Sequence, residues 1–159
     1  DTPWIENREW GRAVYAEKSA KMAYKQAGIK NPAREIDVFE IDDTYAFKEL
    51  QHMEALELCR RGEAGRLARL GETDRGSEMP VNVSGGSLGM GLALDAAGAY
   101  RVVEIALQLR GEAGRRQVEG ARRGLAMAWR GVPSASGAVV KLQAPPVSAV
   151  VAPMGAPPS

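Results

Sequence analysis

The sequence is poor in the side chains that most often bind metals or carry redox chemistry. Its 159 residues include one cysteine, Cys59, and one histidine, His52. A single cysteine excludes an internal disulfide framework and a cysteine-rich zinc site, and we expect no metal site. The lone cysteine also fits a reducing compartment, so we expect a cytoplasmic protein.

The sequence also lacks an excess of either charge and a long apolar run. Its 21 Lys and Arg residues against 20 Asp and Glu give a net charge of +1, so no large field attracts nucleic acid or a membrane surface. No apolar stretch has the length of about 20 residues that a membrane-spanning helix needs. The polar N-terminus DTPWIENREW resembles no signal peptide and lacks an initiator Met. We therefore expect a processed or excised piece of a longer chain.

The composition present is that of a globular domain, with 45% hydrophobic and 26% charged residues. Apolar periodicity predicts helices alternating with strands, an α/β fold with helices on both faces of a sheet. The predicted elements are a helix over 12–27 ended by Gly28, a strand over 35–41, a helix from Asp43 or Thr44 to Arg61, a surface loop over 62–80, a short strand over 81–83, a helix from Asp95 to Gly111, and a hairpin of strands over 124–129 and 137–142. We assign residues 1–143 to the domain and 144–159 to a Pro- and Ala-rich tail.

A glycine-rich loop, NVSGGSLGMG at residues 82–91, precedes a run of small residues. Glycines allow a backbone to approach a ligand closely. We therefore predict that Asn82, Ser84, Gly85 and Gly86 bind the ligand, with a tight strand-to-helix turn as the alternative. The loop is not GxGxxG and no P-loop lysine follows it, which disfavours a nucleotide phosphate site.

Taken together, the segments AYKQAGI, EIDVFEIDDTYAFKEL, CRRGEAGRL, PVNVSGGSLGMG, AAGAYRVVE and QLRGEAGRRQV resemble the C-terminal half of the thiolase family. The branch with the greatest similarity contains sterol-carrier-protein-type thiolases and thiolase-like aldolases. The resemblance covers residues 12–142, and NVSGG is its most specific element. It implies the layered thiolase fold, two similar halves with two helices between two mixed sheets. It also implies a coenzyme A thioester as substrate, with no tightly bound cofactor.

Parts of the family's architecture lie outside the resemblance. These are the first strand, helix and strand of the C-terminal half, and the whole N-terminal half with its nucleophilic cysteine. We therefore expect a fragment or one part of a split assembly, completed by an N-terminal thiolase half in a homo- or hetero-oligomer. The resemblance also implies a small OB-fold, zinc-ribbon partner that helps to hold acyl-CoA. Alone, the chain is not expected to be a stable monomer.

Three catalytic positions of the family carry other residues here. Its Gly-His-Pro stretch corresponds to residues 91–93, where Leu92 can neither accept nor donate a proton. Its Asn or His position corresponds to Asp42, and its late cysteine falls at Ala128 and Trp129. Ordinary Claisen condensation or thiolysis is therefore not expected.

Two interpretations remain open. Retro-aldol cleavage needs a base for a hydroxyl and a group that stabilises an enolate, but no covalent cysteine. The candidates are Tyr45, Asp42 and Asp43. The other interpretation is a non-catalytic thiolase-fold subunit that docks an acyl-CoA-binding partner. In that case the two carboxylates cap the following helix, and Tyr45 belongs to the core or an interface.

Three further side chains have both a functional and a structural interpretation. Trp129 and Arg130 are predicted to line the pocket or to bind a phosphate of coenzyme A, with core packing as the alternative. His52 is expected on the surface of its helix. Cys59 lies outside the family's active-site motifs and is interpreted as packing.

Overall fold

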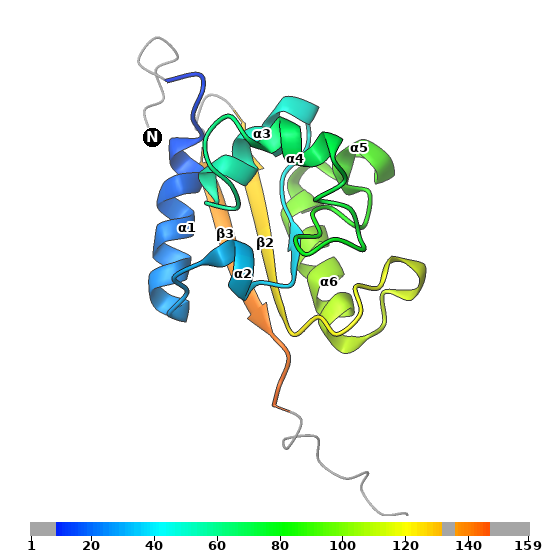
Figure 1. The fold of residues 1–159 in the computed structure, drawn as a ribbon. Helices are drawn as coiled ribbons and strands as arrows, with labels where there is room; N and C mark the ends of the chain where they lie inside the picture. Colours follow the sequence, from blue (N-terminus) through cyan, green and yellow to red (C-terminus); the bar gives the residue numbers. More distant parts are fainter. Residues whose placement is uncertain (1–8, 132–135, 147–159) are drawn as a thin grey trace, which may run out of the picture.

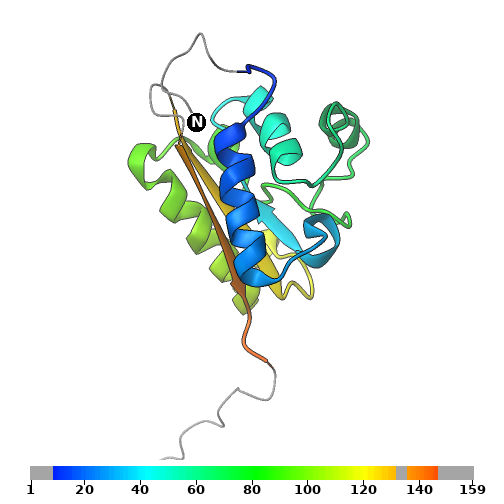
Figure 2. The same ribbon diagram turned by 90° about the vertical axis from the view of Figure 1, so that its left-hand side faces the viewer.

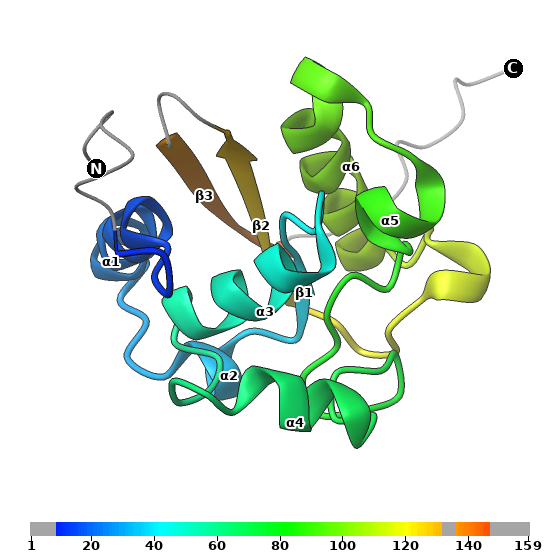
Figure 3. The same ribbon diagram turned by 90° about the horizontal axis from the view of Figure 1, so that it is seen from above.

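The computed structural model describes residues 9–131 and 136–146, which form a three-stranded sheet with helices around it (Figure 1). β1 (Val38–Glu40) lies parallel to β2 (Arg123–Arg130), and β2 pairs antiparallel with β3 (Ser136–Gln143). α1 (Val14–Ala27) covers one face of the sheet and α6 (Ala97–Arg110) the other (Figure 3). The predicted α/β fold, a mixed sheet with helices on both faces, is confirmed.

Small residues allow α6 to lie close against β2. A Cβ atom at Gly124 would lie 2.4 Å from Cγ2 of Ile105, and one at Gly98 would lie 2.9 Å from Cβ of Ala128. Any larger residue at the two glycines would push the helix off the sheet. This close packing brings the start of α6 beside the end of β2.

The opposite face of the sheet carries the larger core. Helix α1 runs along β3 (Figure 2). It buries Tyr15, Ala16, Ala20 and Tyr24 over a cluster that includes Leu125 and Met127. As predicted, Gly28 ends the helix in the left-handed conformation, with φ of 69°.

The predicted helix to Arg61 is too long, because α3 covers only Ala46–Ala55. Glu57 adopts a positive φ of 60°. The Leu58 N–H donates to the Met53 carbonyl and the Glu57 N–H to the Glu54 carbonyl, the pattern of a Schellman ending. The prediction failed because this ending normally carries a glycine, and here a glutamate occupies the position.

The predicted loop over 62–80 contains a helix, α4 (Ala64–Arg69), which buries Ala64 and Leu67. The predicted strand over 81–83 is reduced to one parallel bridge between Val81 and Phe39. β1 is likewise shorter than predicted, and a short helix α2 (Pro32–Glu35) precedes it.

The glycine-rich segment contains more helix than predicted. α5 (Gly86–Met90) and a 3-10 turn, η2 (Leu94–Ala96), precede α6, which starts at Ala97 and ends before left-handed Gly111. The predicted hairpin strands are confirmed in β2 and β3. Their connection at 132–135, and the predicted tail from residue 147 onward, lie outside the described residues.

Candidate functional site

Arg101 forms the centre of a buried polar network and was not predicted from the sequence. Its side chain is 3% exposed, and Nη2 lies 3.2 Å from Oδ2 of Asp42 and 3.3 Å from Oδ1 of Asp43. Nη2 also donates to Oγ of Ser87, and Nε donates to the Ile41 carbonyl. The only signal in the sequence is an arginine on the face of a predicted helix that also carries apolar residues.

The two aspartates are held by the backbone as well as by Arg101. Asp43 accepts hydrogen bonds from the backbone N–H groups of Ser87 and Leu88, 2.7 and 3.2 Å away. Its carboxylate therefore caps α5, not the following helix as the structural interpretation expected. Asp42 accepts from the Thr44 N–H. The N-cap of α3 is Tyr45, with no side-chain cap.

The glycines of the loop make room for one of these carboxylates. Gly86 has φ of 56°, and a Cβ atom there would lie 2.0 Å from Oδ2 of Asp43. Gly85 has φ of 96°, another conformation that favours glycine. The group that lies close to the backbone of Gly86 is therefore the carboxylate of Asp43 in the same chain.

Ser84 and Asn82 connect the loop to β1. Ser84 donates to Glu40 through its backbone N–H (3.0 Å) and its hydroxyl (2.7 Å). Asn82 accepts from the Ile41 N–H and donates to Glu49 on α3. In this structure both predicted ligand-binding residues hold elements of the domain together.

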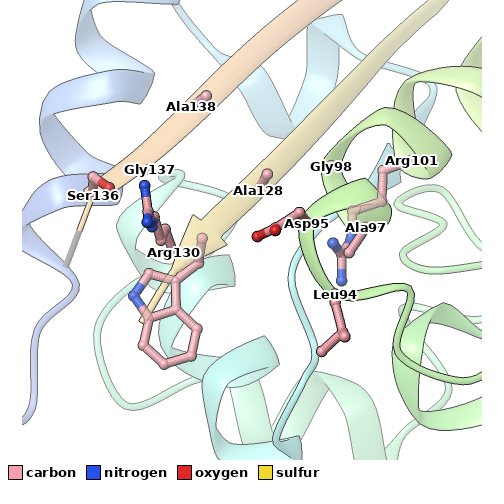
Figure 4. A pocket seen from close by; sticks show the side chains of 11 residues that line it. Leu94, Asp95, Ala97, Gly98, Arg101, Ala128, Arg130, Ser136, Gly137 and Ala138 are labelled. Atoms are coloured by element: carbon pink, nitrogen blue, oxygen red, sulfur yellow. The ribbon is translucent and has the colours of Figure 1, made fainter. Parts of the chain in front are cut away.

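A pocket of about 490 Å³ lies between the start of α6 and the adjacent ends of β2 and β3. Arg101 and Asp95 enter it from the helix side, and Arg130 from the strand side (Figure 4). Trp129 also lines it. Among the described residues that line this pocket there is neither a cysteine nor a histidine. The full lining comprises Leu94, Asp95, Ala97, Gly98, Arg101, Ala128, Trp129, Arg130, Ser136, Gly137 and Ala138.

The expectation of a surface position for His52 was wrong, because the side chain is fully buried. Nδ1 lies 2.7 Å from the Asp42 carbonyl oxygen and Nε2 lies 2.8 Å from the Tyr15 hydroxyl. A carbonyl only accepts, so Nδ1 carries the proton and Nε2 accepts from Tyr15. Burial lowers the pKa of His52 to about 4. A neutral histidine thus fixes the backbone of Asp42.

Tyr45 stands apart from this network. Its side chain is 55% exposed and stacks on Phe47, with ring centroids 5.8 Å apart. In residues 9–131 and 136–146 no hydrogen bond to its hydroxyl is found. The structure therefore brings Asp42, Asp43 and the glycine loop together and leaves Tyr45 at the surface.

The comparisons with known proteins agree with this architecture. A mixed sheet lies between helices, with a glycine loop packed on a buried Arg–Asp network, which is a layered α/β arrangement. Residues 4–142 match the family model described as "Thiolase C-terminal domain-like". The chain belongs to this family.

Relatives of known sequence cover two thirds of the chain. Sterol carrier protein 2 of Bos taurus is 38% identical over 107 residues, which is 67% of this chain and 19% of the relative. Acetyl-CoA acetyltransferase of Methanothermobacter thermautotrophicus is 39% identical over 107 residues, 67% of this chain and 27% of the relative. The chain therefore spans about a fifth to a quarter of the length of these relatives.

A solved structure agrees over more of the chain. The chain titled "Ltp2-ChsH2(DUF35) aldolase" superposes with a TM-score of 0.76 at 26% identity. The superposition covers 88% of this chain and 34% of that one. The thiolase-like fold predicted from the sequence is thus confirmed.

Proposed function

We propose that this chain supplies the C-terminal half of a thiolase-fold enzyme that cleaves a carbon–carbon bond in a coenzyme A thioester by a retro-aldol reaction. The observation that carries the proposal is the pocket beside Arg101. It presents a buried, fixed arginine but, among its described lining residues, no side chain that forms a covalent thioester. The similarity to a protein whose title names an aldolase supports the same reaction class.

The reaction needs two groups, a base that accepts a proton and a hydrogen-bond donor that stabilises negative charge. A base removes the proton of a β-hydroxyl, the Cα–Cβ bond breaks, and the β-carbon becomes a carbonyl. The electron pair remains as an enolate of the thioester, which then takes a proton at Cα. Hydrogen-bond donors that are already in place lower the energy of such an enolate.

Arg101 is suited to stabilise the enolate. Its Nη2 and Nε are used by Asp42, Asp43, Ser87 and the Ile41 carbonyl. Nη1 has no hydrogen bond in the described part of the chain, so it can donate to a ligand oxygen in the pocket. The aspartates hold the guanidinium in place, which suits them to positioning better than to proton transfer.

Tyr45 is our candidate for the acid and base. Tyr45 ends the carboxylate-rich segment IDDTY, and its side chain is 55% exposed in this chain. The proposal therefore requires another part of the enzyme to cover the Tyr45 hydroxyl. Trp129, Arg130 and the loop residues Asn82, Ser84, Gly85 and Gly86 remain our candidates for contacts to the thioester and to coenzyme A, which acts as the substrate carrier.

The exposed face of the loop supports a partner domain. Leu88, Met90, Leu92 and Leu94 are 48–77% exposed in one short segment. Contiguous exposed apolar side chains mark interaction sites. We propose that an N-terminal thiolase half, in the same or a second chain, covers them in a homo- or hetero-oligomer. An OB-fold, zinc-ribbon partner that presents acyl-CoA belongs to the same proposal.

The alternative function is a non-catalytic thiolase-fold subunit that docks an acyl-CoA-binding partner. The position of Tyr45 outside the pocket lining favours this alternative.

No helix in the described part of the chain has the length and apolar character to cross a membrane. We propose a cytoplasmic location because the single cysteine fits a reducing compartment.

Replacing Tyr45 with phenylalanine in the assembled enzyme separates the two functions. The change keeps the ring stack on Phe47 and removes one hydroxyl. Loss of a positioned acid or base lowers kcat by about a hundredfold or more. Turnover of a β-hydroxyacyl-CoA is measured by release of the shortened acyl-CoA.

The matched control is Tyr24→Phe. The Tyr24 hydroxyl is buried and donates to the Leu56 carbonyl, so its loss affects stability but not kcat. Equal turnover by Tyr45→Phe and wild type would remove Tyr45 from the mechanism. Absence of any cleavage by the wild-type assembly would favour the non-catalytic subunit.

A further inference from the structure

Glu40 is a buried carboxyl group beside the glycine loop. It ends β1 and is 0% exposed. In residues 9–131 and 136–146 no Lys, Arg or His forms an ion pair with it. Arg101 lies on α6 nearby, but its guanidinium already bridges the two buried aspartates. An unpaired charge in such a position is costly.

The glycine loop contacts Glu40 directly. Both oxygens of the carboxyl group contact Ser84, through its N–H and its hydroxyl. Glu40 also borders a cavity of about 10 Å³ whose walls include Gly86, Ser87, Gly91 and Ala93. The other walls of this cavity are Ala97, Tyr100 and Arg101 on α6. The segment from Ser84 to Ala93 thus covers this group from one side, and we call this segment the lid.

The neutral acid fits this position without loss of either contact. Oε1 still accepts from the Ser84 N–H, and a protonated Oε2 donates to Ser84 Oγ. Burial and, to a smaller extent, the charge of Glu104 raise the pKa of Glu40, and the net value is about 7. The hydrogen bonds from Ser84, together with Arg101, oppose these effects.

We propose that Glu40 is a proton-operated latch beneath the glycine loop. The neutral acid allows residues 84–93 to close over it, and loss of its proton favours an open loop in which water reaches the carboxylate. Glu40 binds its proton more tightly when the loop is closed than when it is open. Rising pH therefore favours the open loop. The latch does not depend on the reaction proposed above, and it describes this segment where the proposed N-terminal half does not cover Leu88, Met90 and Leu92.

Four other groups act electrostatically on Glu40. They lie on or near α6 and are Glu104, Arg101, Tyr100 and Arg116. Burial raises the pKa of Tyr100 above its usual 10.0, so its hydroxyl stays neutral. The guanidinium of Arg116, whose pKa Glu104 raises, stays charged. Glu40 is the group beneath the lid whose pKa lies near neutral pH.

Hydrogen–deuterium exchange of the purified protein tests the latch. Peptides from residues 84–93 are compared at about pH 6 and pH 8.5 after correction for the intrinsic rates. In wild type the protection of this segment is expected to fall about tenfold at the higher pH. Peptides of α1 serve as the internal control and keep their protection.

Two substitutions identify the responsible group. Glu40→Gln keeps both contacts to Ser84 and cannot ionise, so the loop stays protected at both pH values. Glu49→Gln removes another partly buried carboxylate, which contacts Asn82, and the pH effect persists. Equal corrected protection of wild type at both pH values, or an unchanged pH effect in Glu40→Gln, would overturn the latch.

A titration of wild type covers the case in which Glu40→Gln does not fold. Backbone amide signals of Ser84 and Gly86 are expected to shift with a midpoint near pH 7, the value that burial gives Glu40. A midpoint near the ordinary glutamate value of about 4.3 would contradict the proposal.

Discussion

Replacing Arg101 with methionine is expected to destabilise the protein by about 3–5 kcal/mol, because the change leaves two buried carboxylates without their cation. Asp42 and Asp43 have side chains that are 2% and 3% exposed, so water cannot replace the guanidinium. The Ser87 hydroxyl and the Ile41 carbonyl also lose a donor. Urea unfolding of wild type and variant measures the difference.

Arg110→Met is the matched control on the same helix. Arg110 pairs with Glu112, but their side chains are 68% and 48% exposed. Exposed pairs of this kind contribute about 0–1 kcal/mol. If both variants lose the same small amount, Arg101 does not hold the network together.

Gly86→Ala is expected to cost about 3 kcal/mol or more, since two penalties combine at one position. An L residue at positive φ costs roughly 1–2 kcal/mol. The new Cβ atom would also lie 2.0 Å from Oδ2 of Asp43, so the carboxylate must leave the N–H groups of Ser87 and Leu88. Thermal and urea unfolding report the loss.

Gly89→Ala, three residues further along α5, separates this effect from a general intolerance of the loop. A Cβ atom at Gly89 has no atom within 4 Å, and its φ is not positive. Its stability should remain within about 0.5 kcal/mol of wild type. Equal stability of the two variants would show that Asp43 does not require a glycine at position 86.

The sequence was sufficient to predict the architecture because long elements with a regular apolar period are recognisable from the sequence. The helix that Gly28 ends, the helix that Gly111 ends and the two hairpin strands all appear as predicted. The errors fall where the usual local signal is absent. Glu57 ends α3 in a conformation that glycine usually adopts, and the short helix α4 has only two buried residues.

The sequence drew attention to part of the buried network and of the pocket. Asp42 was selected because it corresponds to the family's Asn or His position, and Asp43 lies beside it. Trp129 and Arg130 line a pocket, and their role there stays a prediction. Arg101 and His52 were missed, because helical periodicity does not reveal that a polar side chain is buried among partners distant in sequence. Such partners become visible only when β1, α3 and α6 are brought together.

Native mass spectrometry of the untagged protein from its own source tests the central claim most directly. We expect an assembly in which this chain is accompanied by an N-terminal thiolase half, within one polypeptide or as a second chain. That half should supply the cover for Leu88, Met90, Leu92 and Leu94. A lone species of 17.0 kDa would contradict the claim that the chain works as half of a thiolase-fold enzyme.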